Sequence, residues 1–148
     1  MKVLIKNHTG LSGYQRRLKK ESLFLLNHFN LSNAELSILL VSDSEMERLN
    51  STFRGKKKTT DVLSFPIYNS LKETPSKGEV LIGDIVINLK AAMRQAQQFG
   101  ISDYEEIRRL LIHGFLHLLG YDHERNRYQE MKMKKKEKEL YNAFKEMD

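Results

Sequence analysis

Three histidines near the end of the chain have the types and spacing needed to hold one metal ion. His113 and His117 are four residues apart, so on a helix their imidazoles share one face, one turn apart. Gly120 can adopt the positive φ that reverses a chain after a helix and returns His123 toward the same point. Zinc accepts imidazole nitrogen, and three protein ligands leave its fourth tetrahedral position open for water. The spacing predicts a catalytic zinc site on His113, His117 and His123.

The composition narrows the chemistry around this site. The chain has no cysteine, which excludes thiolate ligands, a cysteine nucleophile and disulfide-linked partners. Imidazole also suits nickel, copper or iron, so the ligand type alone does not select zinc. Asp122 precedes the third histidine and can accept the second N–H of a ligand imidazole. His8 and His28 have no such neighbours and are predicted to be ordinary histidines.

The spacing also matches a known protease motif, with one difference. Metzincin proteases have H-E-x-x-H-x-x-G-x-x-H, in which the glutamate is the general base. That position is Gly114 here, and losing the base should cost about 10² to 10⁴ in rate where the chemistry needs it. Peptide hydrolysis is therefore disfavoured, although a zinc protease or other amide hydrolase stays open as an alternative. Zinc-bound water can still hydrolyse another kind of bond.

A second group of residues offers phosphate-binding chemistry. Arg54 presents a planar fork of donors suited to a phosphodiester, and it keeps its charge. Lys56, Lys57 and Lys58 follow in a loop that could track an RNA backbone. A helix-end arginine and a solvated lysine loop explain the same cations without a ligand. If Arg54 faces the metal, we expect phosphoryl chemistry.

Polar residues in two predicted strands are further candidates for contact with a metal ligand or with RNA. Ser64 is interpreted most simply as a strand residue, and Asp61 as an acceptor in the preceding turn. Gly83 and Asp84 interrupt an apolar segment, which indicates a β-bulge or the close approach of another group. Asp84 is therefore predicted to lie at the bulge or to accept a hydrogen bond from a metal ligand.

Strands and helices that alternate along the chain must position these residues. We expect strands over residues 2–7, 36–42, 61–65 and 79–88, with Pro66 closing the third. We expect helices over 14–29, from 42 to 55, from 88 to about 100, from 102 to 119 and over 124–147, and a mobile surface loop over 67–78. This pattern predicts an α/β (α+β) fold, with about five helices packed on a mixed sheet of about four strands.

Three helix starts carry capping signals. Ser42 and Ser102 each begin an S-x-x-E capping box, and Asn88 has the side chain of an N-cap residue. No repeat or low-complexity linker divides the chain, and 148 residues suit one core. We therefore expect a single metal-dependent hydrolase domain over residues 1–148.

Charge and hydropathy bear on partners and location. The chain has 25 Lys and Arg against 19 Asp and Glu, a net charge of +6, which makes an anionic partner such as nucleic acid plausible. No apolar segment approaches the ~20 residues of a membrane span, and the first residues have no secretory-signal pattern. We expect a cytoplasmic protein with no membrane partner.

Four segments together resemble the YbeY family of bacterial metal-dependent, single-strand-specific endoribonucleases. The family pattern N-x-x-[YF]-R is met by Asn50, Phe53 and Arg54, and T-D-V-L-S-F-P by residues 60–66. G-D-I follows at residues 83–85, and the highly specific H-G-x-L-H-L-x-G-Y-D-H at residues 113–123. Thr59 stands where the family often has proline, a difference that affects loop stiffness and leaves the ligands in place.

The resemblance implies a function that the spacing alone does not reach. It implies one Zn²⁺ on the three histidines, a catalytic role for Arg54, and cleavage of single-stranded RNA near the 3′ end of small-subunit ribosomal RNA. It equally implies ribosome quality control and association with the ribosomal small subunit. We therefore predict a zinc-dependent endoribonuclease of rRNA processing, with water or the RNA 2′-hydroxyl as nucleophile. A ribosome assembly factor whose metal is structural remains an alternative.

Overall fold

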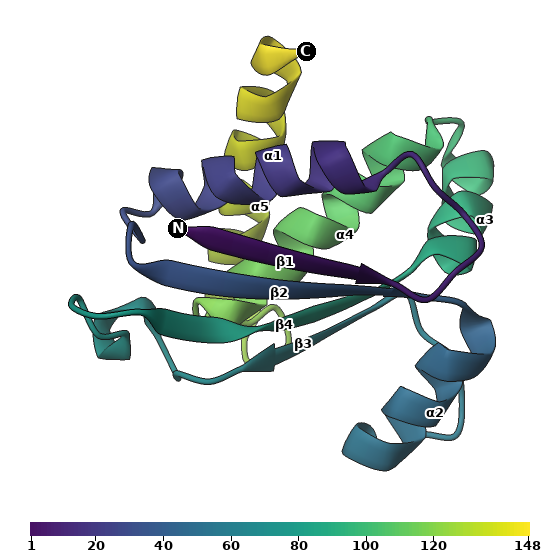
Figure 1. Cartoon of the computed structure of the whole chain (residues 1–148), viewed down its shortest axis with the longest axis horizontal. Helices are drawn as coiled ribbons and strands as arrows, with labels where there is room; N and C mark the ends of the chain where they lie inside the picture. Colours follow the sequence, from purple (N-terminus) through teal and green to yellow (C-terminus); the bar gives the residue numbers. More distant parts are fainter.

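Four strands form one mixed sheet in the computed structural model, which describes residues 1–148 (Figure 1). The strands are β1 (Lys2–Asn7), β2 (Ala34–Val41), β3 (Val62–Pro66) and β4 (Val80–Asn88). Their spatial order is β1-β2-β4-β3, with β1, β2 and β4 parallel and β3 antiparallel to β4. The predicted sheet is confirmed, and β3 is one of its two edges.

Five α-helices surround this sheet. They are α1 (Gln15–His28), α2 (Asp43–Arg54), α3 (Leu89–Phe99), α4 (Asp103–Leu118) and α5 (Arg127–Met147). A short 3₁₀ helix, Leu71–Glu73, lies within the predicted 67–78 loop. In Figure 1, α1 and α4 cover one face of the sheet, α5 packs beyond them, and α2 lies on the other side. None of the helices combines the length and the apolar character that crossing a membrane would require.

The apolar alternation along the strands explains this layering. Leu36, Ile38 and Leu40 of β2 are fully buried and point to the large core beneath α1, α4 and α5. A second, smaller cluster packs α2 on the opposite face of the sheet; its members are Val41, Met46, Leu63 and Val86. The histidine-bearing helix and the arginine-bearing helix therefore lie on opposite faces.

The bulge predicted at Gly83 is present in β4. Leu36 pairs with Gly83 while Glu35 pairs with Leu81, so Ile82 is the additional residue. Gly83 has φ +152°, and a Cβ there would lie 2.6 Å from the Phe65 carbonyl oxygen. Both readings of this glycine, as a bulge and as a close approach, are confirmed.

Two of the three predicted helix caps form as expected. Asn88 and Ser102 each accept a hydrogen bond of 3.1 Å from the backbone N–H three residues later. Ser42 precedes α2, but its side chain makes no capping bond. Glu45, which would complete the capping box, instead binds the His8 ring at 2.9 Å. The capping box predicted at Ser42 is therefore wrong, although the helix begins where expected.

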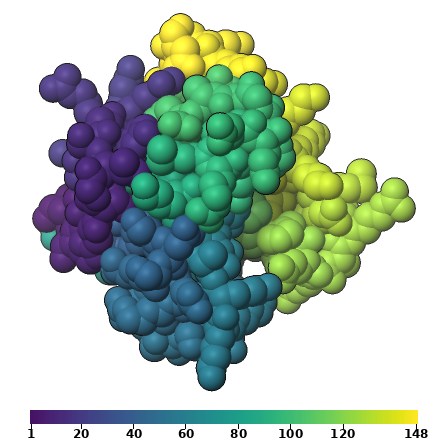
Figure 2. All heavy atoms as spheres, turned by 90° about the vertical axis from the view of Figure 1, so that its right-hand side faces the viewer, coloured from purple at the N-terminus to yellow at the C-terminus, as the bar shows by residue number.

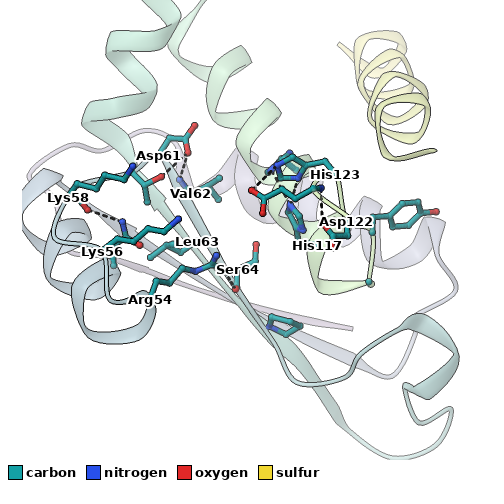
Figure 3. A pocket seen from close by; sticks show the side chains of 17 residues that line it. Arg54, Lys56, Lys58, Asp61, Val62, Leu63, Ser64, His117, Asp122 and His123 are labelled. Atoms are coloured by element: carbon teal, nitrogen blue, oxygen red, sulfur yellow. Dashed lines mark hydrogen bonds and ion pairs between the residues drawn. The ribbon is translucent and has the colours of Figure 1, made fainter. Parts of the chain in front are cut away.

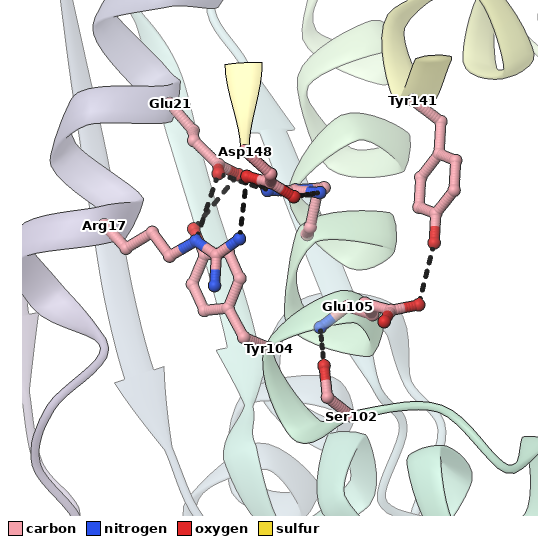
Figure 4. Close-up of polar contacts among 8 residues, drawn as sticks. Arg17, Glu21, Ser102, Tyr104, Glu105, Tyr141 and Asp148 are labelled. Atoms are coloured by element: carbon pink, nitrogen blue, oxygen red, sulfur yellow. Dashed lines mark hydrogen bonds and ion pairs between the residues drawn. The ribbon is translucent and has the colours of Figure 1, made fainter. Parts of the chain in front are cut away.

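A partly buried ion-pair network joins α1 and α4 to residue 148 (Figure 4). Arg108, only 1% exposed, donates to Glu21 at 2.8 and 3.0 Å and to Asp148 at 2.9 and 3.1 Å. The Tyr104 hydroxyl donates to Glu21 at 3.1 Å, and Arg17 donates to Asp148 at 3.0 Å. Burial, followed by the Glu21 charge, raises the pKa of Tyr104, so the phenol remains a donor. This network holds the N-terminal half of α4, whereas the two histidines of this helix lie in its C-terminal half.

A polar network holds the segment that leads into β3. Asn88, which is fully buried, donates to the Asp43 carboxylate at 2.8 Å, to the Thr59 hydroxyl at 3.1 Å and to the Thr60 carbonyl at 3.1 Å. Arg94 of α3 adds two bonds to Asp43, at 2.8 and 2.9 Å. The start of α2 is thereby tied to the end of β4 and to the residues before β3.

We expect this network to make stability depend on pH in acid. Hydrogen bonds, first from Arg94 and then from Asn88, lower the pKa of Asp43 to about 2, whereas the unfolded carboxyl titrates near about 4. Between about pH 4 and pH 2 the unfolded chain binds a proton that the folded chain does not, so this stabilisation is lost as the pH falls.

Thermal unfolding of Asp43→Asn should show a lower Tm at pH 7 and a shallower fall of Tm between pH 4 and pH 2. Glu47→Gln, at an exposed position on the same helix, is the control and should follow the wild type. An Asp43→Asn profile parallel to that of the wild type would contradict the assignment.

Candidate functional site

Helix α4 places two histidines on one face and then ends in a sharp reversal. His113 and His117 lie one turn apart, with their Nε2 atoms 3.2 Å apart. Gly120, at φ +96°, donates its backbone N–H to the His117 carbonyl at 3.1 Å, and Tyr121 donates to the Leu116 carbonyl at 3.0 Å. These bonds form a Schellman motif, the helix ending that a glycine at this position favours.

The reversal brings His123 to the same point. Its Nδ1 lies 3.1 Å from Nε2 of His117, and one nitrogen from each of the three rings lies within 4.8 Å of the others. Ligand nitrogens around a tetrahedral zinc are about 3.3 Å apart, given Zn–N bonds of about 2.0–2.1 Å. The three-histidine cluster predicted from spacing is confirmed, and its donor set fits one divalent transition metal.

The electrostatics of the cluster favour the ligand form of the central ring. Burial, followed by the neighbouring His113 and His123 rings, lowers the pKa of His117. A neutral imidazole offers a lone pair to a metal, whereas a protonated one offers none. His117 therefore remains available as a ligand at lower pH than an isolated histidine.

The hydrogen-bond partners of the rings differ from the sequence prediction. The bond expected from a ligand imidazole to Asp122 is not formed; the Asp122 carboxylate instead accepts the Glu124 backbone N–H at 2.9 Å and closes the turn. Glu137 of α5 instead lies 3.2 Å from Nδ1 of His113. Glu137 stands in a lysine-rich segment 24 residues after the histidine, and no sequence motif marked it.

The three histidines line one wall of an open cleft of about 540 Å³. The opposite wall comes from the end of α2, the loop after it and β3 (Figure 3). In Figure 2 a hollow separates the blue surface of α2 and its loop from the yellow-green surface that follows α4. Further lining residues include Asn50, Arg54, Lys56, Lys58, Asp61, Ser64, Tyr121, Asp122 and Glu124. The two groups of residues found in the sequence thus meet in one cavity.

Arg54 faces this cavity from the last residue of α2. Its Nη2 donates to the Ser64 carbonyl at 3.4 Å, which uses one of the five N–H donors of the guanidinium. The Ser64 hydroxyl donates to the Gly114 carbonyl at 3.0 Å. Ser64 therefore connects the arginine wall with the histidine helix, and its hydroxyl is engaged by the protein itself.

The cationic loop is positioned by a buried amide. Asn50, 2% exposed, donates from Nδ2 to the Lys58 carbonyl at 2.9 Å. Lys56 and Lys58 line the cleft, whereas Lys57 does not. Two of the three predicted lysines thus accompany Arg54.

Asp84 directly follows the bulge, which was one of its two predicted positions, but it lies away from the cleft and contacts no metal ligand. It pairs across the sheet with Phe65, while Ile85, on the other face, lies where it would meet a Cβ at Gly114 of α4. The cause is the bulge at Ile82 and Gly83, which shifts the in-and-out alternation by one residue. Asp84 therefore points to the face opposite α4.

Gly114 marks the closest approach of α4 to the sheet. A Cβ at this position would lie 2.9 Å from Cγ2 of Ile85, 3.2 Å from Oγ of Ser64 and 3.3 Å from Cγ2 of Val62. The glutamate that metzincin proteases carry here has no space in this fold. The fold therefore leaves no room for the general base on which a metzincin-type hydrolase depends.

Comparison with known proteins finds relatives along nearly the whole chain. A family model described as "Endoribonuclease YbeY" matches residues 5–145. The Endoribonuclease YbeY of Persephonella marina is 46% identical over 127 residues, which cover 84% of this chain and 80% of the relative. That of Aquifex aeolicus is 39% identical over 137 residues, which cover 89% of this chain and 88% of the relative.

A solved structure shows the same architecture. The solution structure of TM1509 from Thermotoga maritima superposes with a TM-score of 0.63 at 26% sequence identity. The superposition covers 97% of this chain and 92% of that protein. The similarity therefore includes the sheet, both walls of the cleft and α5.

The close contact between α4 and the sheet at Gly114 can be tested by a substitution with alanine, which adds one methyl group. Alanine is the better helix former by up to about 1 kcal/mol, but forced contacts in a packed core cost about 1–3 kcal/mol. We expect Gly114→Ala to destabilise the protein in urea unfolding and to weaken metal binding, because α4 must move from β3. Gly10→Ala, where a Cβ meets nothing within 4 Å, should change stability little. A Gly114→Ala protein as stable as the wild type would refute the proposed tight contact.

Proposed function

Because this chain belongs to the YbeY family of endoribonucleases, we propose that its cleft cuts RNA in ribosomal RNA processing. The observation that carries this proposal is the position of Arg54, which lines the same open cleft as the three imidazoles. A cation opposite a metal-binding cluster suits an anionic phosphodiester better than a neutral peptide. The lack of space for a glutamate at position 114 supports the same choice.

The substrate that best fits this cleft is single-stranded RNA. Arg54, Lys56 and Lys58 gather positive charge on one wall, and such grooves bind a nucleic-acid backbone without reading its sequence. A single strand can place one phosphate between the arginine and the histidines. Double-stranded RNA, by contrast, is recognised by proteins mainly through the shape of its grooves. The net charge of +6 favours the same partner.

Each wall of the cleft has its own task in this proposal. His113, His117 and His123 hold the metal, which supplies Lewis-acid chemistry when bound. Arg54 binds the phosphoryl oxygens and stabilises the charge that develops there, which is the larger source of rate in phosphoryl transfer. Lys56 and Lys58 hold the flanking backbone. Cleavage by the 2′-hydroxyl would leave a cyclic or 3′-phosphate, so analysis of the product ends identifies the nucleophile.

We propose zinc as the metal. Three imidazole nitrogens within reach of one another form the donor set of open zinc sites, with no thiolate or carboxylate ligand among them. Nickel, copper and iron accept the same ligands, so metal analysis of the purified protein decides between them.

The wider role follows from the family. We propose that the enzyme acts near the 3′ end of small-subunit ribosomal RNA, on the ribosomal small subunit, in the cytoplasm. We also propose that residues 1–148 form a single hydrolase domain; the single sheet and the one large core cluster support this.

The role of Arg54 predicts a separation of cleavage from metal binding. We expect Arg54→Ala to lower the rate of single-stranded RNA cleavage by about 10²- to 10³-fold, as for loss of one preorganised donor. The metal content should be unchanged, because the histidines are intact. Arg48→Ala, at an exposed position on the same helix, serves as the control and should cut normally. Full cleavage by metal-loaded Arg54→Ala would rule out this role.

The metal site predicts that a chelator abolishes cleavage. Treated protein should lose activity on single-stranded RNA and recover it when zinc is added, while duplex RNA of the same sequence should remain uncut. Metal analysis before and after chelation gives the stoichiometry, which we expect to be one ion per chain. Cleavage that is indifferent to the chelator, or preference for duplex, would overturn the proposal.

A further inference from the structure

Glu137 contacts one of the three histidines from outside the cluster. Its Oε2 lies 3.2 Å from Nδ1 of His113, whose other nitrogen, Nε2, lies 3.2 Å from His117. We propose that Glu137 is a positioning residue for the metal centre: its carboxylate accepts a hydrogen bond from Nδ1–H of His113 and so holds Nε2 toward the ion. The inference rests on the metal site proposed above, but it is tested by metal affinity and ring chemistry rather than by RNA cleavage.

The chemistry of imidazole makes this contact selective. A neutral ring carries its proton on one nitrogen and a lone pair on the other. A carboxylate at Nδ1 accepts a hydrogen bond only if Nδ1 holds the proton, which leaves the lone pair on Nε2. The carboxylate also makes the ligating nitrogen more basic, as carboxylate–histidine pairs do in metal proteins. Glu137 therefore favours the one tautomer of His113 that can bind the ion.

The position of Glu137 on α5 shows that packing alone does not account for it. Met133, Leu140 and Phe144 form the fully buried stripe of this helix, and residue 137 falls between them at helical spacing. An apolar side chain would continue the stripe, whereas a carboxylate held mostly out of water is costly unless it is hydrogen bonded. The His113 ring supplies that bond. Both side chains are about three-quarters buried, with 24% and 25% exposed.

The neighbouring lysines of α5 pair with other carboxylates and not with that of Glu137. Lys134 pairs with Glu130 at 2.9 Å, and Lys136 lies 3.4 Å from Glu139. The His113 ring is the one hydrogen-bond partner of the Glu137 side chain. Glu137 is thus not a member of the surface ion pairs that run along α5.

The other two rings have no equivalent partner. The nearest carboxylate to His123 is that of Glu124, at 3.6 Å and with 83% of its side chain exposed. His117 makes its contacts with the other two rings. Glu137 is therefore the residue of α5 whose side chain hydrogen-bonds a ring of the cluster.

The test compares three variants at two positions of α5. Competition with a chromophoric chelator should show zinc affinity reduced by about 10- to 100-fold in Glu137→Ala, the usual effect of removing such a partner. Glu137→Gln keeps an amide oxygen that can accept a hydrogen bond from Nδ1–H, so its affinity should lie between those of Glu137→Ala and the wild type. Glu139→Ala, two residues away and exposed, should bind zinc as the wild type does.

The tautomer of His113 distinguishes a positioning role of Glu137 from a merely structural one. In the metal-free protein, ¹⁵N spectra of the imidazoles should show His113 protonated on Nδ1 in the wild type and a mixture of tautomers in Glu137→Ala. Glu137→Gln should fall between them, because its amide can also donate to an unprotonated Nδ1. A role in packing alone predicts instead a lower Tm for Glu137→Ala with the His113 tautomer unchanged.

The outcomes distinguish this inference from the proposed function. Wild-type zinc affinity in folded Glu137→Ala, or equal losses in Glu137→Ala and Glu137→Gln with an unchanged tautomer, would overturn the positioning role and leave the metal site standing. Failure of the wild-type protein to bind any divalent metal would overturn both. A graded loss of affinity with the expected tautomer change would support the role of Glu137.

Discussion

The close contact of α4 with the sheet at Gly114 is the constraint on which the site depends. Without a Cβ at this position, the Ser64 hydroxyl reaches the Gly114 carbonyl at 3.0 Å. The Ser64 carbonyl, on the same residue, accepts from Arg54. One strand residue therefore sets how far the arginine stands from the helix that carries His113 and His117. A wider spacing between α4 and the sheet would move the arginine away from the histidines that bind the metal.

The strand order explains why the cleft opens at this place. In the order β1-β2-β4-β3, β3 lies at an edge, so the groups beyond it face solvent rather than another strand. α4 reaches this edge from one face of the sheet and the end of α2 reaches it from the other (Figure 1). Asn88 and Asp43 fasten α2 to the end of β4 at 2.8 Å. These contacts fix the positions of the side chains that come to this edge from both faces of the sheet.

Local geometry decides which features the sequence could predict. The histidine cluster follows from a helical repeat and one positive-φ turn at Gly120, and neither depends on distant parts of the chain. The Ser42 capping box failed because Glu45 binds His8, which is 37 residues away. Gly83 and Asp84 within an apolar segment predicted the bulge, but the face on which Asp84 lies depends on the shift of alternation that the bulge causes. Errors arose where a long-range contact or a change of register replaced a local rule.

Glu137 lies at the limit of this reasoning, because its meaning depends on how α5 packs. In the sequence it is one acid among many lysines, with no periodic signal of its own. In the fold it interrupts a buried apolar stripe and meets the outer nitrogen of His113 at 3.2 Å. Natural cores accept a carboxylate in such a place at a cost in stability, and that cost is offset only by a hydrogen-bonded partner. Because the partner is a ring whose other nitrogen faces the metal centre, the metal centre accounts for this residue better than folding does.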